Sequence, residues 1–372
     1  MELKIRVGTL PIRIMGEDIG SQLKEFFLSF PETEEDPRIS FIFNNSLDGK
    51  GGHKESISLV AAEIHDQTLR FTDYAAPVGY LVELSTGGTL KVKCNVNDTS
   101  RVTGLKQRLN MVRFFNSFYL GKEERSLNFI YSLWQYVLQI LLIETGASLI
   151  HASCVEKNGK VLMFPAWGGA GKTSMMYRLV MNGDWRFLSD DMSILSQDGV
   201  LYLNSAPIAV YPYNLKGLPQ LYRRISELQS LGGRIHWHLG NRILGENRVG
   251  RRIFPRDLFG DRKVADQGIL DKAIYLVRWN ATTFHFDSIC AEELASHAVN
   301  VLLAEIRQFR YEFQAWNSVP NFSLFRNIWE IAERTRIILA EAFKNKDLHV
   351  LYIPKQAVPN DIHAFVSRYI ES

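Results

Sequence analysis

The stretch that most constrains the fold of this chain is residues 161–174, VLMFPAWGGAGKTS. Its four consecutive small residues, Gly168–Gly171, leave room for backbone N–H groups to converge on an anion. Lys172 and Thr173 follow in the lysine and hydroxyl positions of the phosphate-binding pattern G-x-x-x-x-G-K-[ST]. We therefore expect a phosphate-binding loop, built from Gly168, Gly169, Ala170, Gly171, Lys172, Thr173 and Ser174.

The residues on either side of this loop have the patterns that such a loop requires. The apolar run 160–166 predicts a strand, and 172–183 has a helical pattern that ends at Gly183. A helix that begins at the loop adds the positive end of its dipole to the anion site. The opening glycine of the motif is replaced by Ala166, at the strand exit, where a small residue with a compatible φ can serve.

Two neighbouring carboxylates follow the loop at Asp190 and Asp191, at the end of the strand-like run 185–195. Strand ends in an open α/β sheet line the ligand crevice, so one carboxylate can hold Mg²⁺ while the other accepts a proton from an attacking hydroxyl. His151, in the preceding strand, is by its apolar surroundings more typical of a core residue. It can also orient a carboxylate or the incoming hydroxyl.

The composition excludes several classes of protein. With 372 residues, 46% of them hydrophobic, the chain can form two domains, and a net charge of +3 gives no basic groove for nucleic acid. Cys94, Cys154 and Cys290 form neither a disulfide framework nor a zinc spacing. No signal segment opens the chain, and the apolar run 129–143 is too short and too polar for a membrane span. We expect a cytoplasmic protein without a membrane partner.

The pattern of apolar residues changes twice along the chain. Residues 1–98 predict a β-rich domain with a hairpin turn at Gly87-Gly88, and residues 99–146 a helical connection. Residues 147–372 predict the loop-containing domain, in which residues 200–245 are expected to be irregular. Its later elements are strands at 269–279 and 348–354 and helices at 291–309, 323–345 and 360–370.

These motifs together resemble the HPr kinase/phosphorylase family, bacterial serine kinases with a fold akin to phosphoenolpyruvate carboxykinase. That family has a histidine before the loop, then a helix and a strand that ends in Asp-Asp. It also has a downstream signature, E-x-R-G-x-G-x-I-x-x-R-x-L-F-G, and ENRVGRRIFPRDLFG at 246–260 is similar to it. The positions in register are Glu246, Arg248, Ile253, Arg256, Leu258, Phe259 and Gly260.

The resemblance implies an α/β fold (α+β overall) with a P-loop kinase core, and a kinase that uses ATP and Mg²⁺. Lys172 would hold the nucleotide phosphates, and Thr173 would ligate Mg²⁺ through its hydroxyl. Asp190 would accept the proton of a substrate serine, with His151 assisting.

The resemblance assigns the remaining site residues as well. Asp191 and Glu246 would complete the metal site, and Arg256 would neutralise charge on the transferring phosphoryl group. The departures are Ala166, the substituted glycine pair at 249–251 and a longer interval before Glu246. The similarity covers roughly residues 148–280, so the chain is expected to be a relative of HPr kinase and not that enzyme itself.

The acceptor is expected to be a serine, or another hydroxyl, of a peptide or small protein. Some related kinases modify precursor peptides in ribosomal-peptide biosynthesis, which makes peptide tailoring one expectation. Two alternatives stay open: a nucleotide-binding regulatory or assembly module without transfer activity, and a small-molecule kinase such as a free-serine kinase. Assembly into a homo-oligomer is also left open.

Two further features have more than one interpretation. His236 and His238 in HWH have metal-ligand spacing if the segment is a strand, but no third ligand is nearby. Tyr211, Tyr213 and Asn214 lie either on an acceptor surface or in a proline-kinked loop.

Overall fold

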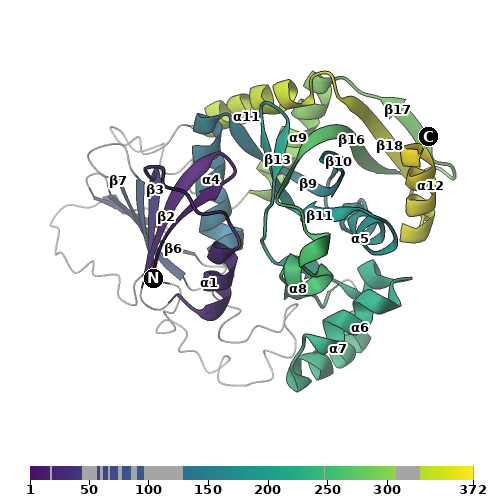
Figure 1. The fold of residues 1–372 in the computed structure, drawn as a ribbon, viewed down its shortest axis with the longest axis horizontal. Helices are drawn as coiled ribbons and strands as arrows, with labels where there is room; N and C mark the ends of the chain where they lie inside the picture. The colour runs from purple at the N-terminus through teal and green to yellow at the C-terminus, as the bar shows by residue number, and fades with distance from the viewer. Residues whose placement is uncertain are drawn as a thin grey trace. The chain divides into compact units, whose positions relative to one another are not determined.

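The structure is a computed structural model of the chain, and it is a mixed α/β protein (Figure 1). It describes residues 1–16, 19–43, 57–58, 62–65, 68–73, 78–84, 90–95, 129–246, 248–306 and 327–371. The chain divides into two compact units. The first unit comprises residues 1–110, 120–145 and 306–331, and the second comprises residues 111–119, 146–305 and 332–372.

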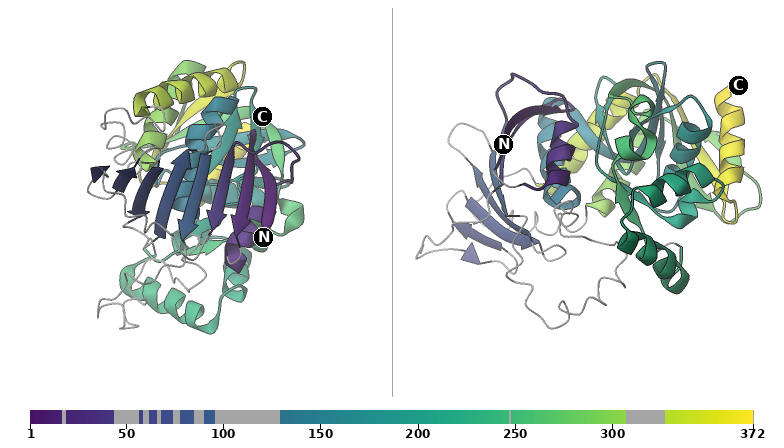
Figure 2. Two further views of the ribbon diagram at one scale, coloured as in Figure 1. Left: turned by 90° about the vertical axis from the view of Figure 1, so that its left-hand side faces the viewer. Right: turned by 60° about the horizontal axis from the view of Figure 1, so that its bottom comes forward.

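The first unit contains a sheet whose strands lie side by side in the order β1-β2-β3-β8-β7-β6-β5-β4 (Figure 2). The strands β7 and β8 pair antiparallel, as a hairpin requires, with Gly79 opposite Asn95 at one end and Leu84 opposite Leu90 at the other. The expected Gly87-Gly88 turn itself lies outside the described residues. The strands are β1 (Glu2–Val7), β2 (Leu10–Gly16), β3 (Ile39–Phe43), β4 (Ile57–Ser58), β5 (Ala62–His65), β6 (Thr68–Asp73), β7 (Val78–Leu84) and β8 (Leu90–Asn95).

An aromatic cluster joins this sheet to its helices. The apolar run from residue 129 forms a buried helix, as expected, in three parts: η1 (Ile130–Trp134), α4 (Gln135–Leu142) and η2 (Ile143–Thr145). Trp134 packs against Phe26 and Phe27 of α1 (Ser21–Leu28) with ring centroids 5.5 and 5.4 Å apart. Helix α1 has no counterpart among the elements expected from the sequence. No described helix of either unit is both long and apolar enough to cross a bilayer.

The second unit is built on a sheet with the strand order β10-β9-β12-β13-β16-β18-β17, and β11 pairs with β9. Because β16 also pairs with β10, five of these strands close into a ring. The strands are β9 (Ala147–Lys157), β10 (Lys160–Pro165), β11 (Arg186–Ser189), β12 (Met192–Ser196), β13 (Val200–Tyr202), β16 (Gln267–Trp279), β17 (His285–Ser288) and β18 (Asp347–Pro354).

This sheet is not the open α/β sheet in which the site was expected, because it closes on itself and most of its strand pairs are antiparallel. Strand β9 pairs antiparallel with β10, β11 and β12, whereas β10–β16 and β16–β18 are parallel. The cause is local: Asn158 and Gly159 connect β9 to β10 with φ of 55° and 82°. Two consecutive positive φ values are those of a tight hairpin turn, which forces neighbouring strands to run antiparallel.

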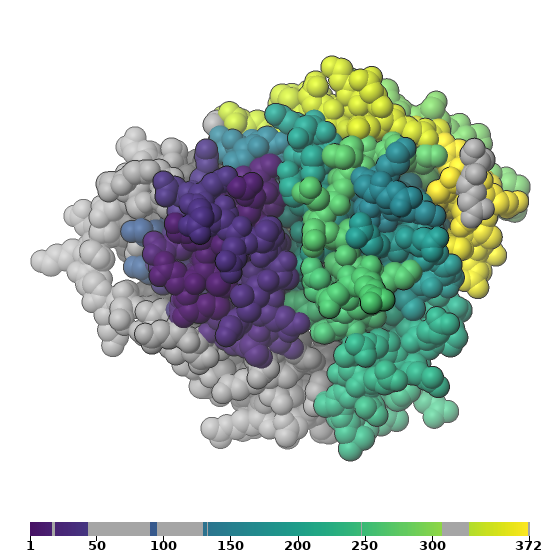
Figure 3. Space-filling model, viewed as in Figure 1, coloured from purple at the N-terminus to yellow at the C-terminus, as the bar shows by residue number. Residues whose placement is uncertain are grey.

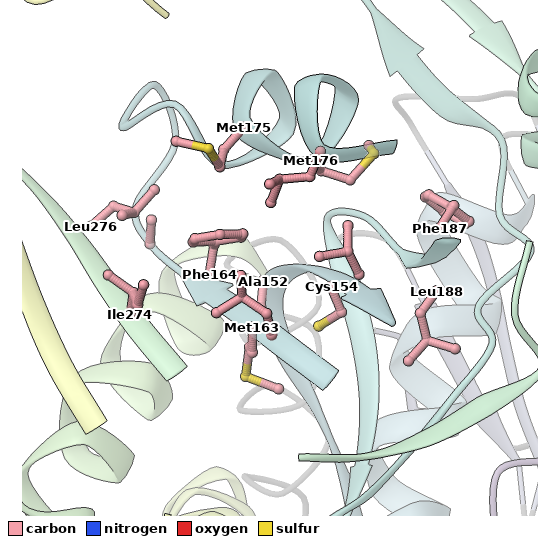
Figure 4. Packing of buried hydrophobic residues seen from close by; sticks show 14 of the residues in the cluster. Ala152, Cys154, Met163, Phe164, Met175, Met176, Phe187, Leu188, Ile274 and Leu276 are labelled. Carbon is pink, nitrogen blue, oxygen red and sulfur yellow. The ribbon is translucent and has the colours of Figure 1, made fainter. Parts of the chain in front are cut away.

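Helix α5 (Lys172–Asn182) covers the centre of this sheet. Figure 4 shows Met175 and Met176 of α5 lying over Phe164 and Ala152 in the buried core. Strand β9 is buried along almost its whole length, so it can hold polar side chains in fixed positions beside the loop. The other helices of this unit are α6 (Pro219–Glu227), α7 (Leu231–Leu244), α8 (Pro255–Phe259), α9 (Ala291–Glu305) and α12 (Pro359–Glu371), with α11 (Ile328–Phe343) spanning the unit boundary.

The expectation that residues 200–245 are irregular is wrong. They contain β14 (Ile208–Val210), η3 (Pro212–Leu215) and the helices α6 and α7. Pro219 is at the first turn of α6, where its missing N–H has no cost, and Ser230 caps α7 by accepting the N–H of Gly233 at 3.2 Å. Residues 236–238 therefore lie on a helix, and a strand-type histidine pair is excluded there.

Candidate functional site

The glycine-rich loop connects β10 directly to α5. Gly169 and Gly171 have φ of 81° and 115°, which favour glycine. Ala166, in contrast, still belongs to the sheet: it is buried, forms a bridge with Leu276 and does not have a positive φ. The position of Ala166 therefore does not require the glycine of the motif.

The N-terminus of α5 faces this loop without a side-chain cap. The first helical hydrogen bond runs from the N–H of Met175 to the carbonyl of Gly171 at 3.0 Å. The N-cap residue is Gly171, which has no side chain that could accept a first-turn N–H. Unpaired N–H groups at a helix start attract an anion, and the largely buried Lys172 adds a positive charge at the same point.

Asp190 and Asp191 lie in a tight turn between β11 and β12, and not at the end of one long strand. The N–H of Met192 donates to the carbonyl of Asp190 at 2.9 Å. Asp191 is the central residue of this turn and has a φ of 68°. The N–H of Ala152 in β9 holds the carbonyl of Asp191 at 3.1 Å. Such a three-residue turn is uncommon and strained, and strain of this kind clusters at functional sites.

The Asp190 carboxylate contacts two hydroxyl groups. The hydroxyl of Thr173 donates to its two oxygens at 3.0 and 3.1 Å, and the hydroxyl of Ser153 also donates to it. Burial raises the pKa of Asp190 above its ordinary value, although the charge of Lys172 acts in the opposite direction. The expected hydroxyl position of the loop is thus joined to Asp190 and not to Asp191.

The Asp191 carboxylate contacts His151 and is 57% exposed. Nε2 of the buried His151 lies 2.9 Å from Oδ1 of Asp191. Desolvation raises the pKa of Asp191, but the hydrogen bond and charge of His151 outweigh it and lower the pKa to about 2. Lys172 and Arg252 lower it further. Asp191 is therefore an ionised, solvent-exposed carboxylate that the buried His151 holds in place through a hydrogen bond.

The sequence analysis did not single out Ser153, Glu305 or Arg252, which also act on the residues of this site. Nδ1 of His151 makes no hydrogen bond in the described part of the chain, and Oε1 of Glu305 lies 3.7 Å from it. A Cβ at Gly168 would lie 3.9 Å from the same oxygen of Glu305. Ser153 could have been found, because it lies two residues from His151 and so on the same face of β9. Glu305 and Arg252 carry no such signal, since only the fold brings them here.

Two residues expected at the site, Glu246 and Arg256, form ion pairs with other side chains. Nζ of Lys216 holds Oε2 of Glu246 at 2.6 Å, and Arg256 pairs with Asp261 and Asp266 at 3.1 and 3.3 Å. Both side chains are partly exposed. In the ranges that the structure describes, no hydrogen bond or ion pair joins Glu246 or Arg256 to Asp190 or Asp191, and no three His, Cys, Asp or Glu side chains form a metal cluster.

The two histidines of HWH have separate structural roles. His236 is buried, and its Nδ1 lies 3.1 Å from Nη2 of Arg251. His238 is exposed beside Tyr222, with the tyrosine hydroxyl 3.3 Å from its Nδ1. The two imidazoles therefore do not face a common metal site, as expected for residues two positions apart on a helix.

The two tyrosines of the 211–214 segment stack on each other and feel the charges of the aspartates. Tyr211 and Tyr213 stack with ring centroids 5.7 Å apart. Burial raises the pKa of both, and the charges of Asp191 and Asp190 act in the same direction on Tyr211 and Tyr213 respectively. Asn214 is instead a buried structural residue, because its amide donates to the hydroxyl of Ser174 at 3.0 Å. The side chain of Ser174 is thus already occupied.

Comparison with known proteins adds little to this geometry. No protein-family model matches the chain, and no curated protein matches its sequence. Among solved structures, the HPr(Ser) kinase/phosphatase from Coxiella burnetii has a weak likeness, with a TM-score of 0.21 and 14% sequence identity. The match covers 46% of this chain and 95% of that chain. A likeness this weak carries no argument, so the interpretation of the site rests on its own residues.

Proposed function

We propose that this protein is a kinase that uses ATP and Mg²⁺ to phosphorylate a serine, or another hydroxyl, of a peptide or small protein. One observation carries the proposal: the uncapped start of α5, the buried Lys172 and two aspartates with different partners meet beside one glycine-rich loop. Phosphoryl transfer requires positioning and charge neutralisation more than covalent chemistry, and these groups supply both.

Thr173 and Asp190 suit the metal. A hydroxyl and a carboxylate that are already in contact are hard oxygen donors, which Mg²⁺ prefers. Mg²⁺ usually keeps several waters and binds through one or two carboxylates and substrate phosphates, so a small set of protein ligands is sufficient. When bound, the ion would neutralise charge on the nucleotide phosphates. Glu246 is not required in this arrangement.

Asp191 suits the acceptor hydroxyl. Its exposed carboxylate is ionised at neutral pH and is oriented by His151. It would accept a hydrogen bond from the acceptor hydroxyl. It would then take the hydroxyl proton as the bond between the hydroxyl oxygen and the γ-phosphorus forms and the bond from that phosphorus to the leaving nucleoside diphosphate breaks. These assignments reverse the division of roles between Asp190 and Asp191 that the family resemblance implies.

A nucleotide-binding module without transfer activity is the second candidate. It is favoured by the ion pairs of Glu246 with Lys216 and of Arg256 with Asp261 and Asp266. A kinase that needs those two side chains at the phosphates would first have to break these pairs. The two candidates differ in whether phosphate leaves the nucleotide for an acceptor.

The test is incubation of the full-length protein with γ-labelled ATP, Mg²⁺ and an extract of the source cells resolved into peptides, proteins and metabolites. We expect one labelled peptide or small protein, with labelling reduced by about 100-fold or more in Asp191→Asn. Asp190→Asn should instead raise the Mg²⁺ concentration that transfer requires. Asp184→Asn, an exposed aspartate paired with Lys157, is the matched control. Label in a metabolite would indicate a small-molecule kinase, and unchanged labelling in Asp191→Asn would exclude the proposed role.

A further inference from the structure

Helix α7 has one face that packs against the rest of the second unit and one that is exposed. The inner face consists of Gly233, His236, Trp237 and Gly240, all buried. Arg251 holds this face through a hydrogen bond to the carbonyl of Gly233 at 2.6 Å and a cation–π contact with Trp237 at 5.0 Å. The helix is therefore firmly attached, and its outer face is presented in a fixed orientation.

The outer face carries a row of large apolar side chains at every fourth residue. Leu231, Ile235, Leu239 and Ile243 are exposed by 74, 46, 44 and 61%. Residues four apart lie one above the other on a helix, so these four form one continuous stripe, about 18 Å long at 1.5 Å per residue. Contiguous exposed apolar groups mark interaction sites more often than single ones do. We call these four residues the α7 stripe.

A row of basic side chains runs beside the α7 stripe. Arg234, His238 and Arg242 each precede a stripe residue, and all three are exposed. The helix from Leu231 to Leu244 contains no aspartate or glutamate. A partner that covers both rows must therefore offer apolar side chains next to acidic ones, because opposite charges steer association and like charges oppose it.

The segment that carries the stripe begins and ends beside the candidate site. The chain enters α6 from η3, where the amide of Asn214 donates to the hydroxyl of Ser174 in α5 at 3.0 Å, and leaves α7 for β15 (Arg251–Ile253). Strand β15 pairs with β14, and Lys216 bonds Glu246 across the base of the segment. The helices α6 and α7 stand at the surface on the face drawn in Figure 3. The segment that carries α7 is thus anchored next to the glycine-rich loop at its two ends.

We infer that the outer face of α7 docks an acidic, amphipathic segment of the acceptor polypeptide, separate from the residue that is phosphorylated. The identity of the bound polypeptide as the phosphate acceptor rests on the proposed kinase function. The claim that α7 binds a polypeptide rests on the α7 surface alone. Apolar side chains of the bound segment would pack along the α7 stripe, and its acidic side chains would face Arg234, His238 and Arg242. An anionic membrane is less suited, because membrane-surface helices bury a broad apolar face and this stripe is one residue wide.

The test is selection of a displayed library of random 20-residue peptides on the full-length protein. The selected pools are compared for wild type, the stripe variant Ile235→Ser/Leu239→Ser and the charge variant Arg234→Glu/Arg242→Glu. The control is Trp329→Ser/Ile337→Ser, which removes two exposed apolar side chains from α11. Thermal melting of each variant shows that it is folded.

Wild type and control should select peptides rich in Asp, Glu and large apolar residues. The stripe variant should bind those peptides at least about tenfold more weakly, because two apolar contacts are lost. The charge variant should select basic peptides instead. Equal binding by the stripe variant, no selected peptide, or no acidic bias would each overturn the inference.

Two other outcomes would assign the surface differently and so also overturn the inference. One is stripe-dependent binding to vesicles with 30% phosphatidylserine without peptide selection, and the other is a stripe-dependent dimer in light scattering. Titration of the wild type with Mg²⁺ and ATP distinguishes this failure from failure of the proposed function. Peptide selection without ATP binding would refute the kinase alone, and ATP binding without peptide selection would refute the docking surface alone.

Discussion

Adjacent residues of the same type acquire different properties in this site because of what contacts them. Burial raises the pKa of Asp190, and His151 lowers that of the exposed Asp191. The sequence predicted that both aspartates and His151 matter, because histidine, loop and Asp-Asp occur in a recognisable order. It could not predict which carboxylate contacts which partner. That depends on the turn between β11 and β12, where Asp191 takes a positive φ.

An ion pair next to the turn of the β9–β10 hairpin, between Glu156 and Arg186, leads to a prediction on stability. Glu156 is fully buried, accepts from Nε of Arg186 at 2.6 Å and also binds the N–H of Gly159 in the turn. Desolvation raises the pKa of Glu156, but these hydrogen bonds outweigh it and hold the pKa below its ordinary value. Glu156→Gln should lower the free energy of unfolding by about 1.5–3 kcal/mol at pH 7, as expected for a lost charged hydrogen bond.

The pH dependence of this effect has a definite sign. Because the pKa is lower in the folded state, the stabilisation is complete above the unfolded pKa, about 4.3, and is lost as the pH falls through the folded value. The difference in urea unfolding between wild type and Glu156→Gln should therefore shrink as the pH falls below about 4.3. Glu333→Gln, in the exposed pair with Arg336, is the control and should show no measurable change. A difference between the two proteins that persists at low pH would contradict this account.

At the scale of the element, the loop is where the sequence was most informative. A strand, small residues and a helix follow in the order that the residues dictate, and Asn158-Gly159 forms the turn that its type favours. The helices α6 and α7 were missed because the many Pro, Gly and Tyr residues of 200–245 obscure their periodicity. Pro219 and Ser230 are helix-start residues that could have revealed both.

A pair of glycine substitutions in the loop distinguishes backbone strain from steric crowding by an added Cβ. Gly171→Ala should destabilise the second unit by about 1–2 kcal/mol, because an L-residue is strained at a φ of 115°. Gly168→Ala is the matched control, since Gly168 has no positive φ and the closest atom to a new Cβ would be Glu305 Oε1 at 3.9 Å. Thermal unfolding of both variants measures the difference. Equal destabilisation would show that the loop does not have this conformation.

At the scale of the whole molecule, the fold class could be predicted and the sheet topology could not. The chain is mixed α/β, but the sheet of the second unit is largely antiparallel, and β16 closes a ring with β10. Pairings between strands more than 100 residues apart leave no local pattern in a single sequence. The same limit hid Glu305, and it hid the ion pairs that Glu246 and Arg256 form with Lys216, Asp261 and Asp266.

The central claim is that the glycine-rich loop, Lys172 and the aspartate turn form one nucleotide site. Calorimetric titration of the full-length protein with ATP and Mg²⁺ tests it directly, with Lys172→Ala as the variant and the exposed Lys355→Ala as the control. We predict a dissociation constant below about 1 mM for wild type and control, and binding at least about tenfold weaker for Lys172→Ala. Equal affinities for wild type and Lys172→Ala, or no binding by wild type, would contradict the claim.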